Sequence, residues 1–279
     1  MKHELLSTPV NESLVVTGKL RALVLGDIVG QPGCRAVFIG LKALIKEYKS
    51  DFVIINGENA AEGFGITPEI AAQVFASGAD VITSGNHIWQ KREIYPLLDS
   101  DSPILRPANY PVGTPGKGSV VIEVKGVSIA VLNLQGRKDF GNLDCPFRIG
   151  LENSKKLKSK SKIIIVDFHA ESVNEKEALG IYLDGKVSAV LGTHTHIQTA
   201  DERILPGGTA YLSDIGMTGP SMSVIGSDYN ISVRRSLTQM PLKHEVSKNP
   251  AVMSGVILDL DTSTGKCLSI KRFKKLSAL

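Results

Sequence analysis

Short apolar runs alternate with amphipathic helical patterns through the first half of the chain, and this alternation constrains the fold most strongly. Residues 21–25 are typical of a buried strand, and the apolar spacing over residues 36–48 predicts a helix that buries one face. The same signals predict further strands at 52–55 and 81–83 and further helices at 67–75 and about 90–98. Such an alternation favours a sheet flanked by helices.

The second half combines more strands and helices with two predicted antiparallel hairpins. The hairpins are 120–124 with 127–134, around Lys125-Gly126, and 252–260 with 267–273, around a Thr-Ser-Thr-Gly turn. Between them the pattern predicts strands at 163–168 and 189–191 and helices at about 151–157 and 174–183. No repeat or linker is visible, so we expect a single α/β domain over residues 20–279, with two packed sheets and helices outside.

Composition is that of an ordinary globular protein, with 42% apolar and 22% charged residues in 279. The three cysteines are far apart and odd in number, which indicates neither a disulfide framework nor a metal clip and favours a reducing, cytoplasmic compartment. No apolar run is long enough to span a membrane. Residues 1–19 lack the apolar core of a signal peptide and are predicted to be a flexible N-terminal extension.

Basic residues give a formal net charge of +4. They gather in residues 155–162 and 271–275, where aromatic side chains that could stack on bases are almost absent. We therefore interpret these runs as a solvated helix end and a solvated tail, in preference to a surface for nucleic acid.

Polar residues that can bind metals follow five predicted strands. They are Asp27, Glu58 with Asn59, Asn86 with His87, His169, and His194 with His196. One such residue alone is usually a turn residue or a helix cap. Five together, with four of the six histidines, indicate a common site, because the carboxyl ends of parallel strands meet at one edge of a sheet.

The residue types favour two metal ions. His194 and His196 lie two apart on a segment expected to be extended, so their rings point to opposite sides and suit neighbouring metals. Imidazole, carboxylate and amide donors together favour Fe or Mn, or else Zn, over Mg or Ca. Two divalent cations carry more positive charge than two carboxylates neutralise. The site therefore keeps a net positive charge, which suits an anionic phosphate ester.

The order of these blocks resembles the calcineurin-like metallophosphoesterase superfamily, whose blocks are D-x-H, G-D-x-x-D, G-N-H-[DE], H and G-H-x-H. The sequence motifs at residues 26–30, 57–61 and 214–220 resemble its YmdB-type branch of bacterial phosphodiesterases. The resemblance extends from about residue 20 to 273. Val29 stands where the wider superfamily has a histidine, and Glu58 stands where it has an aspartate. The resemblance implies a four-layer α/β/β/α sandwich of two mixed sheets flanked by helices, and a homo-oligomer.

The resemblance also implies a ligand set for each metal. Asp27, Glu58, Asn59 and His196 would surround one ion, and Glu58, Asn86, His169 and His194 the other, with Glu58 between them.

The resulting hypothesis is hydrolysis of a small phosphodiester, with 2′,3′-cyclic nucleotides suggested by the family, through attack by a hydroxide that bridges the metals. His87 is the candidate general acid for the leaving oxygen, and supporting Asn86 is its other possible role. Arg137 could bind a phosphate oxygen or be a surface arginine. Residues 216–220 are expected to be a turn or a flexible pocket wall.

Two other functions fit the same residues. One is a phosphomonoesterase that acts on nucleotides or phosphoproteins. The other is a metal-stabilised regulator that binds RNA or a protein partner through its basic surface. A complete ligand set with His87 beside it favours catalysis, because a purely structural metal site needs no open position for a substrate.

Overall fold

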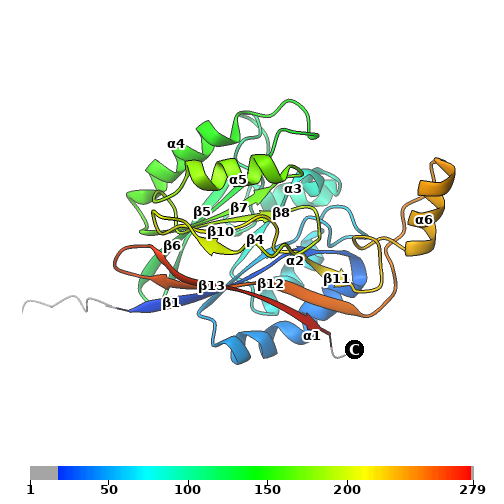
Figure 1. Ribbon diagram of the computed structural model, residues 1–279, viewed down its shortest axis with the longest axis horizontal. Coiled ribbons are helices and arrows are strands. Elements are labelled where there is room, and N and C mark those ends of the chain that lie inside the picture. The colour runs from blue at the N-terminus through cyan, green and yellow to red at the C-terminus, as the bar shows by residue number, and fades with distance from the viewer. Residues whose placement is uncertain (1–17, 278–279) are drawn as a thin grey trace, which may run out of the picture.

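The computed structural model describes residues 18–277, and two mixed β-sheets pack face to face at its centre (Figure 1). The first sheet has the order β2-β11-β12-β1-β3-β4, with β13 paired to β12. Its strands are β1 (Lys19–Leu25), β2 (Asp27–Ile28), β3 (Phe52–Asn56), β4 (Val81–Thr83), β11 (Met217–Pro220), β12 (Ala251–Asp261) and β13 (Cys267–Leu276).

The second sheet has the order β5-β6-β7-β8-β10-β9. Its strands are β5 (Ser119–Val124), β6 (Val127–Gln135), β7 (Ile163–His169), β8 (Ala189–Thr193), β9 (Arg203–Ile204) and β10 (Ala210–Leu212). Strands β1, β3 and β4 run parallel in the first sheet, and β6, β7, β8 and β10 run parallel in the second. Each sheet therefore presents several carboxyl ends at one edge.

Helices cover the outer face of each sheet (Figure 1). Helices α1 (Gly30–Tyr48) and α2 (Pro68–Ala76) pack on the first sheet, and α4 (Pro146–Lys158) and α5 (Val173–Tyr182) pack on the second. The short α3 (Tyr95–Leu98) contributes Leu98 to the core beneath α1 and α2, whereas α6 (Tyr229–Thr238) projects from the body and has no buried residue. The layers are therefore α/β/β/α, as the sequence predicts.

Alternating side chains along the strands build three apolar cores. In β1, Leu23 and Leu25 face the helices of the first sheet, while Ala22 and Val24 face the second sheet. In β7, Ile165 belongs to the core between the sheets and Val166 to the core beneath α4 and α5. This period of two is the strand geometry that buries both faces of a central sheet.

Most predicted elements are present, but their boundaries differ. Helix α1 begins at Gly30, six residues before the predicted start at 36, and α4 begins at Pro146 instead of about 151. The helix predicted at 90–98 is wrong: the chain forms two 3₁₀ turns, at Asn86–Trp89 and Arg92–Ile94, before the four-residue α3. Pro96 is the reason, because proline is tolerated only in the first turn of a helix.

Three further points concern the predicted ends and surface of the chain. Residues 1–17 of the predicted extension 1–19 lie outside the described residues, and Lys19 already belongs to β1. The single domain over 20–279 stays a prediction. Among the described residues, no helix combines the length and the apolar character that crossing a membrane requires.

Candidate metal centre

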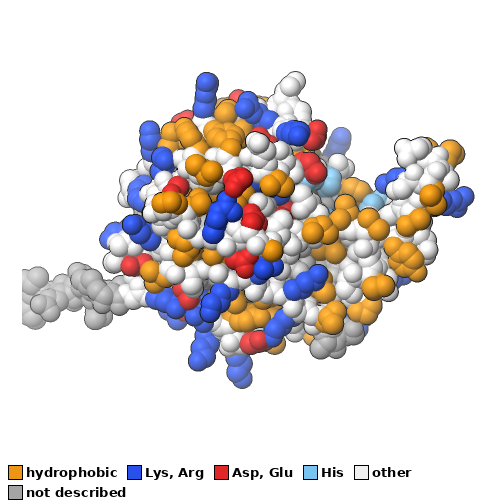
Figure 2. All heavy atoms as spheres, viewed as in Figure 1, with side chains coloured by type: hydrophobic (Ala, Val, Ile, Leu, Met, Phe, Trp, Pro, Cys, Tyr) orange, Lys and Arg blue, Asp and Glu red, His pale blue; other side chains and the backbone are white. Residues whose placement is uncertain are grey.

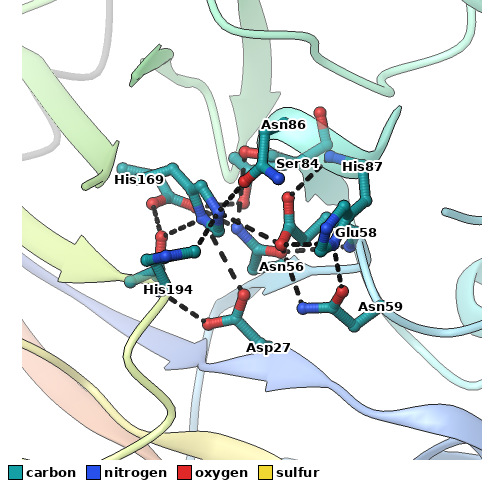
Figure 3. Close-up of polar contacts among 12 residues, drawn as sticks. Asp27, Asn56, Glu58, Asn59, Ser84, Asn86, His87, His169 and His194 are labelled. Atoms are coloured by element: carbon teal, nitrogen blue, oxygen red, sulfur yellow. Dashed lines mark hydrogen bonds and ion pairs between the residues drawn. The ribbon is translucent and has the colours of Figure 1, made fainter. Parts of the chain in front are cut away.

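The predicted metal-binding residues meet where the carboxyl ends of both sheets come together (Figure 3). Asp27 begins β2 just after β1, Glu58 follows β3, and Asn86 follows β4, all from the first sheet. His169 is the last residue of β7 and His194 directly follows β8, both from the second sheet. The site therefore lies between the sheets, and histidine side chains are visible in the hollow between the body and α6 (Figure 2).

His169 is at the centre of the first group of donor atoms. Its Nε2 lies 3.1 Å from Glu58 Oε1, 3.0 Å from His194 Nδ1 and 3.2 Å from Asn86 Oδ1. Ligand atoms of Glu58, His169 and His194 all lie within 4.8 Å of one another. Glu58 and His169 are fully buried. One carboxylate, two imidazoles and an amide at these separations form a donor set that suits a transition-metal ion.

Asp27, Asn59 and His196 form the second group, next to the first. Asn59 Nδ2 lies 3.1 Å from His196 Nε2 and donates to Glu58 Oε1 at 3.0 Å, and His196 Nε2 lies 3.9 Å from Asp27 Oδ1. Asp27 is fully buried, and its Oδ1 has no hydrogen-bond partner among the described residues. A buried carboxylate oxygen without a partner is costly. A bound cation would satisfy it, so the residues present fit a metal here as well.

Burial and mutual contact separate the pKa values of these residues. Burial alone would lower the pKa of His169, but the carboxylates of Glu58 and Asp27 raise it to about 9. Burial, together with His169, lowers the pKa of His194 to about 3. Burial raises the pKa of Asp27 to about 6 against the opposing effect of His196 and His169.

Glu58 shifts in the opposite direction to Asp27. Burial alone would raise the pKa of Glu58, but contacts with His169 and His87 hold it well below its usual range. Without metal, the cluster therefore contains a His169 imidazolium beside a Glu58 carboxylate. Metal binding to such a site requires a neutral imidazole and therefore releases a proton.

A glycine makes room for the ligands. A Cβ at residue 85 would lie 2.2 Å from Glu58 Oε2 and 2.2 Å from His169 Cδ2. Both of those side chains are fully buried, so neither can turn out into solvent. This close approach explains why glycine precedes Asn86 and His87 in the sequence.

His87 lies at the edge of the cluster. Its Nδ1 lies 2.7 Å from Asn59 Oδ1 and 3.3 Å from Glu58 Oε1, and its backbone N–H donates to Glu58 Oε2 at 3.3 Å. The side chain is 23% exposed, and its ring packs edge-on against the ring of Phe64 with centroids 5.0 Å apart. Because Nδ1 faces the buried amide, Nε2 is the nitrogen left for a substrate.

Neighbouring side chains orient two of the histidines. Thr193 Oγ1 lies 3.0 Å from His169 Nδ1 and donates to Asp167 Oδ1 at 2.7 Å, so Asp167 orients His169 through a hydroxyl. Glu171 Oε2 lies 3.0 Å from His194 Nε2. These contacts resemble the carboxylate partners that usually fix metal-binding imidazoles.

Arg137 and His244 lie outside the cluster, and the segment 216–220 differs from expectation. Arg137 lies in the turn after β6, where its backbone N–H donates to Glu175 Oε1 at 3.0 Å and its side chain is exposed. His244, which no sequence block includes, packs against the ring of Phe64 with centroids 5.0 Å apart, and its Nε2 lies 2.6 Å from Ser227 Oγ. The segment expected to be a turn or flexible wall at 216–220 contains the buried strand β11 instead.

Most of the chain matches one known family of proteins. The model of the family described as YmdB-like protein matches residues 23–273. This chain belongs to the YmdB-like family.

Relatives of this YmdB-like protein cover nearly its whole length. It is 47% identical over 253 residues to the 2′,3′-cyclic-nucleotide 2′-phosphodiesterase of Bacillus subtilis, covering 91% of this chain and 96% of that protein. A hypothetical protein from Thermus thermophilus superposes with a TM-score of 0.86 at 39% identity, covering 92% and 100% of the two chains. A structure described as a novel phosphatase from Mycoplasma pneumoniae gives 0.88 at 33% identity, covering 94% and 95%. The fold is therefore the metallophosphoesterase fold.

Proposed function

We propose that this protein is a metal-dependent phosphodiesterase that hydrolyses small phosphodiesters, in particular 2′,3′-cyclic nucleotides. The observation that carries the proposal is the meeting of two carboxylates, two amides and three imidazoles in one cluster between the sheets, with both carboxylates and His169 fully buried. The 47% identity to a 2′,3′-cyclic-nucleotide 2′-phosphodiesterase supports the choice of substrate.

Two divalent cations, Fe or Mn in preference to Zn, are the proposed cofactors. Glu58, Asn86, His169 and His194 would hold one, and Asp27, Glu58, Asn59 and His196 the other. Glu58 lies between the two sets: its Oε1 is 3.1 Å from His169 Nε2 of one set, and it accepts a hydrogen bond from the amide of Asn59 of the other. Such ions polarise phosphoryl oxygens and lower the pKa of a water molecule.

The role of His87 follows from the bond that breaks. Hydrolysis of a 2′,3′-cyclic phosphate to a 3′-phosphate breaks the bond between phosphorus and the 2′ oxygen. Water supplies the new oxygen on phosphorus, and the ribose oxygen must gain a proton. His87 is the proposed donor, because it borders the cluster, its side chain is partly exposed and its Nδ1 is occupied by Asn59, which leaves Nε2 for the substrate.

The residues around the opening shape the site. The ring of Phe140 packs edge-on against His194 with centroids 4.8 Å apart, and Phe64 does the same to His87 at 5.0 Å. These apolar rings hold the two imidazoles and reduce their contact with water. Arg137, exposed in the turn that leads to Phe140, stays a proposed phosphate contact.

Hydrolysis of phosphate monoesters is a second candidate function. The name of the structurally similar Mycoplasma pneumoniae protein, a novel phosphatase, favours it. The site geometry is compatible with both reactions, since the cluster presents the same donors to a monoester and a diester.

The test is hydrolysis of 2′,3′-cyclic AMP and of p-nitrophenyl phosphate by protein reconstituted with Mn²⁺, with bound metal measured on the same samples. Asp27→Asn is the control, because it keeps the side-chain volume and removes a ligand charge. We expect metal-dependent hydrolysis of the cyclic nucleotide that the control lacks. Activity on the monoester alone would establish the phosphatase, and no activity with metal bound would favour a binding protein for RNA or another protein.

A further inference from the structure

The segment that carries two of the metal-binding histidines has an unusual backbone. His194 has a φ of 101° and His196 a φ of 66°, both in the left-handed region that non-glycine residues rarely adopt. Only Thr195 separates them. Such a conformation persists only where the surrounding structure enforces it, and the position of both imidazoles depends on it.

Asp214 is the residue that holds this turn. Its Oδ2 accepts hydrogen bonds from both the backbone N–H of Thr195, at 3.0 Å, and the Thr195 hydroxyl, at 2.8 Å. The backbone of Asp214 also pairs with Thr199, whose N–H donates to Asp214 O at 3.1 Å and whose Oγ1 accepts from Asp214 N at 3.0 Å. The segment from 195 to 199 is therefore tied to one residue at both of its ends.

Lys176, in α5, provides the opposite charge. Its Nζ lies 2.8 Å from the same Asp214 Oδ2, and both side chains are only 1% exposed. The other carboxylate oxygen, Oδ1, accepts from Gly216 N at 2.8 Å. Lysine is almost never this deeply buried, and a buried ion pair contributes little net stability compared with apolar residues of similar size. The burial of Lys176 here is better explained by the Thr195 hydrogen bonds that the Asp214 carboxylate accepts.

We infer that Lys176 and Asp214 are positioning residues for both metal ions. The Lys176 ammonium fixes the position of the Asp214 carboxylate, and this carboxylate fixes Thr195. Thr195 in turn sets the backbone conformation of its two neighbours, His194 and His196. Because one histidine belongs to each proposed ligand set, a disturbance of this chain of contacts affects both ions together. The inference rests on the proposed function only in taking these histidines as ligands.

The experiment measures metal binding instead of turnover. Thr195→Val removes one hydrogen bond to Asp214 and keeps the side-chain shape, whereas Thr195→Ser keeps both donors. Lys176→Met removes the charge from a side chain of similar length. The control, Asp259→Asn, removes the carboxylate of another ion pair, with Arg21 Nε 2.8 Å from Asp259 Oδ1, on strands away from the site. Equilibrium dialysis against Mn²⁺, with metal measured per chain, gives the affinity, and thermal unfolding reports the fold.

We expect Thr195→Val and Lys176→Met to bind both manganese ions about 10–100-fold more weakly, the range found when the partners of metal ligands are removed. Thr195→Ser and Asp259→Asn should bind as the wild type does. If Lys176→Met does not fold, Thr195→Val decides the question. Unchanged affinity in a folded variant, or loss of one ion only, overturns the inference. A wild-type protein that binds no manganese overturns the proposed function instead.

Discussion

The His87→Ala variant distinguishes two roles of this imidazole: donating a proton to the leaving oxygen, or supporting the metal ligands. The imidazole has two possible contributions in this structure. Its Nδ1 lies 2.7 Å from Asn59 Oδ1, which orients a proposed ligand, and its Nε2 is left for the substrate. The first contribution acts on every substrate equally, whereas the second acts only where the leaving oxygen needs a proton.

The two contributions differ in magnitude. A hydrogen bond of this kind contributes about 1 kcal/mol, which corresponds to roughly fivefold in rate for any substrate. Proton donation by a positioned side chain contributes about 10²–10⁴-fold. The 2′ oxygen of a cyclic nucleotide leaves as a strongly basic alkoxide and requires the proton. The nitrophenolate of bis(p-nitrophenyl) phosphate is weakly basic and leaves without it.

We therefore expect His87→Ala to lower kcat/KM for 2′,3′-cyclic AMP by about 10²–10⁴-fold and for bis(p-nitrophenyl) phosphate by less than about tenfold. Bound metal per chain is measured in parallel. Phe64→Ala is the matched control, because it removes the ring that packs on His87 and keeps the imidazole, the group that can donate the proton. Equal losses on both substrates, or loss of metal in the variant, would refute the assignment of His87 as the acid.

Three further changes test other parts of the structure. Gly85→Ala places a Cβ 2.2 Å from Glu58 Oε2, so we expect metal binding to fall at least about tenfold, while Gly18→Ala, in open space, leaves metal binding unchanged in the same dialysis assay. Burial alone would raise the pKa of Asp259, but Arg21, Lys19 and Ser269 lower it to about 2. This carboxylate therefore stabilises the fold above its unfolded pKa of about 3.9 and stops doing so as pH falls through about 2. Urea unfolding should show Asp259→Asn less stable than wild type by about 1–2 kcal/mol at pH 7, with a smaller difference at pH 3. Removing metal with a chelator should lower Tm by about 5–10 °C for each site that was saturated at about 100 times Kd, and Asp27→Asn should show a smaller decrease.

The central strands and the meeting of the donors could be predicted because they follow from local patterns. Runs such as 52–55 and 163–168 are apolar on both faces, which only central strands require. Once those strands are parallel, residues directly after them must lie at one edge. Glu58, Asn86 and His169 therefore come together in the structure although 28 residues or more separate each from the next in the chain.

The features that sequence patterns did not predict depend on contacts between distant segments. Lys176 looks like any helical lysine, and only the fold shows that it is buried against Asp214. His244 approaches Phe64 through a segment without regular apolar spacing. Helix α6 buries none of its residues, so no apolar stripe facing a core marks it in the sequence. Burial and pairing of this kind arise from tertiary packing, which local propensity does not contain.

The candidate site also departs from what folding alone favours. Asp27 holds a buried oxygen without a hydrogen-bond partner among the described residues, and His194 and His196 occupy left-handed backbone. Each feature opposes folding by an amount of order 1–3 kcal/mol, and simple substitutions to an apolar residue or to glycine would remove it. These costs lie at the convergence of the same strand ends that carry the donors. A fold that needed these residues only for stability would gain by losing the unpaired Asp27 oxygen and the two left-handed histidines. Their presence together therefore supports a site built to hold cations.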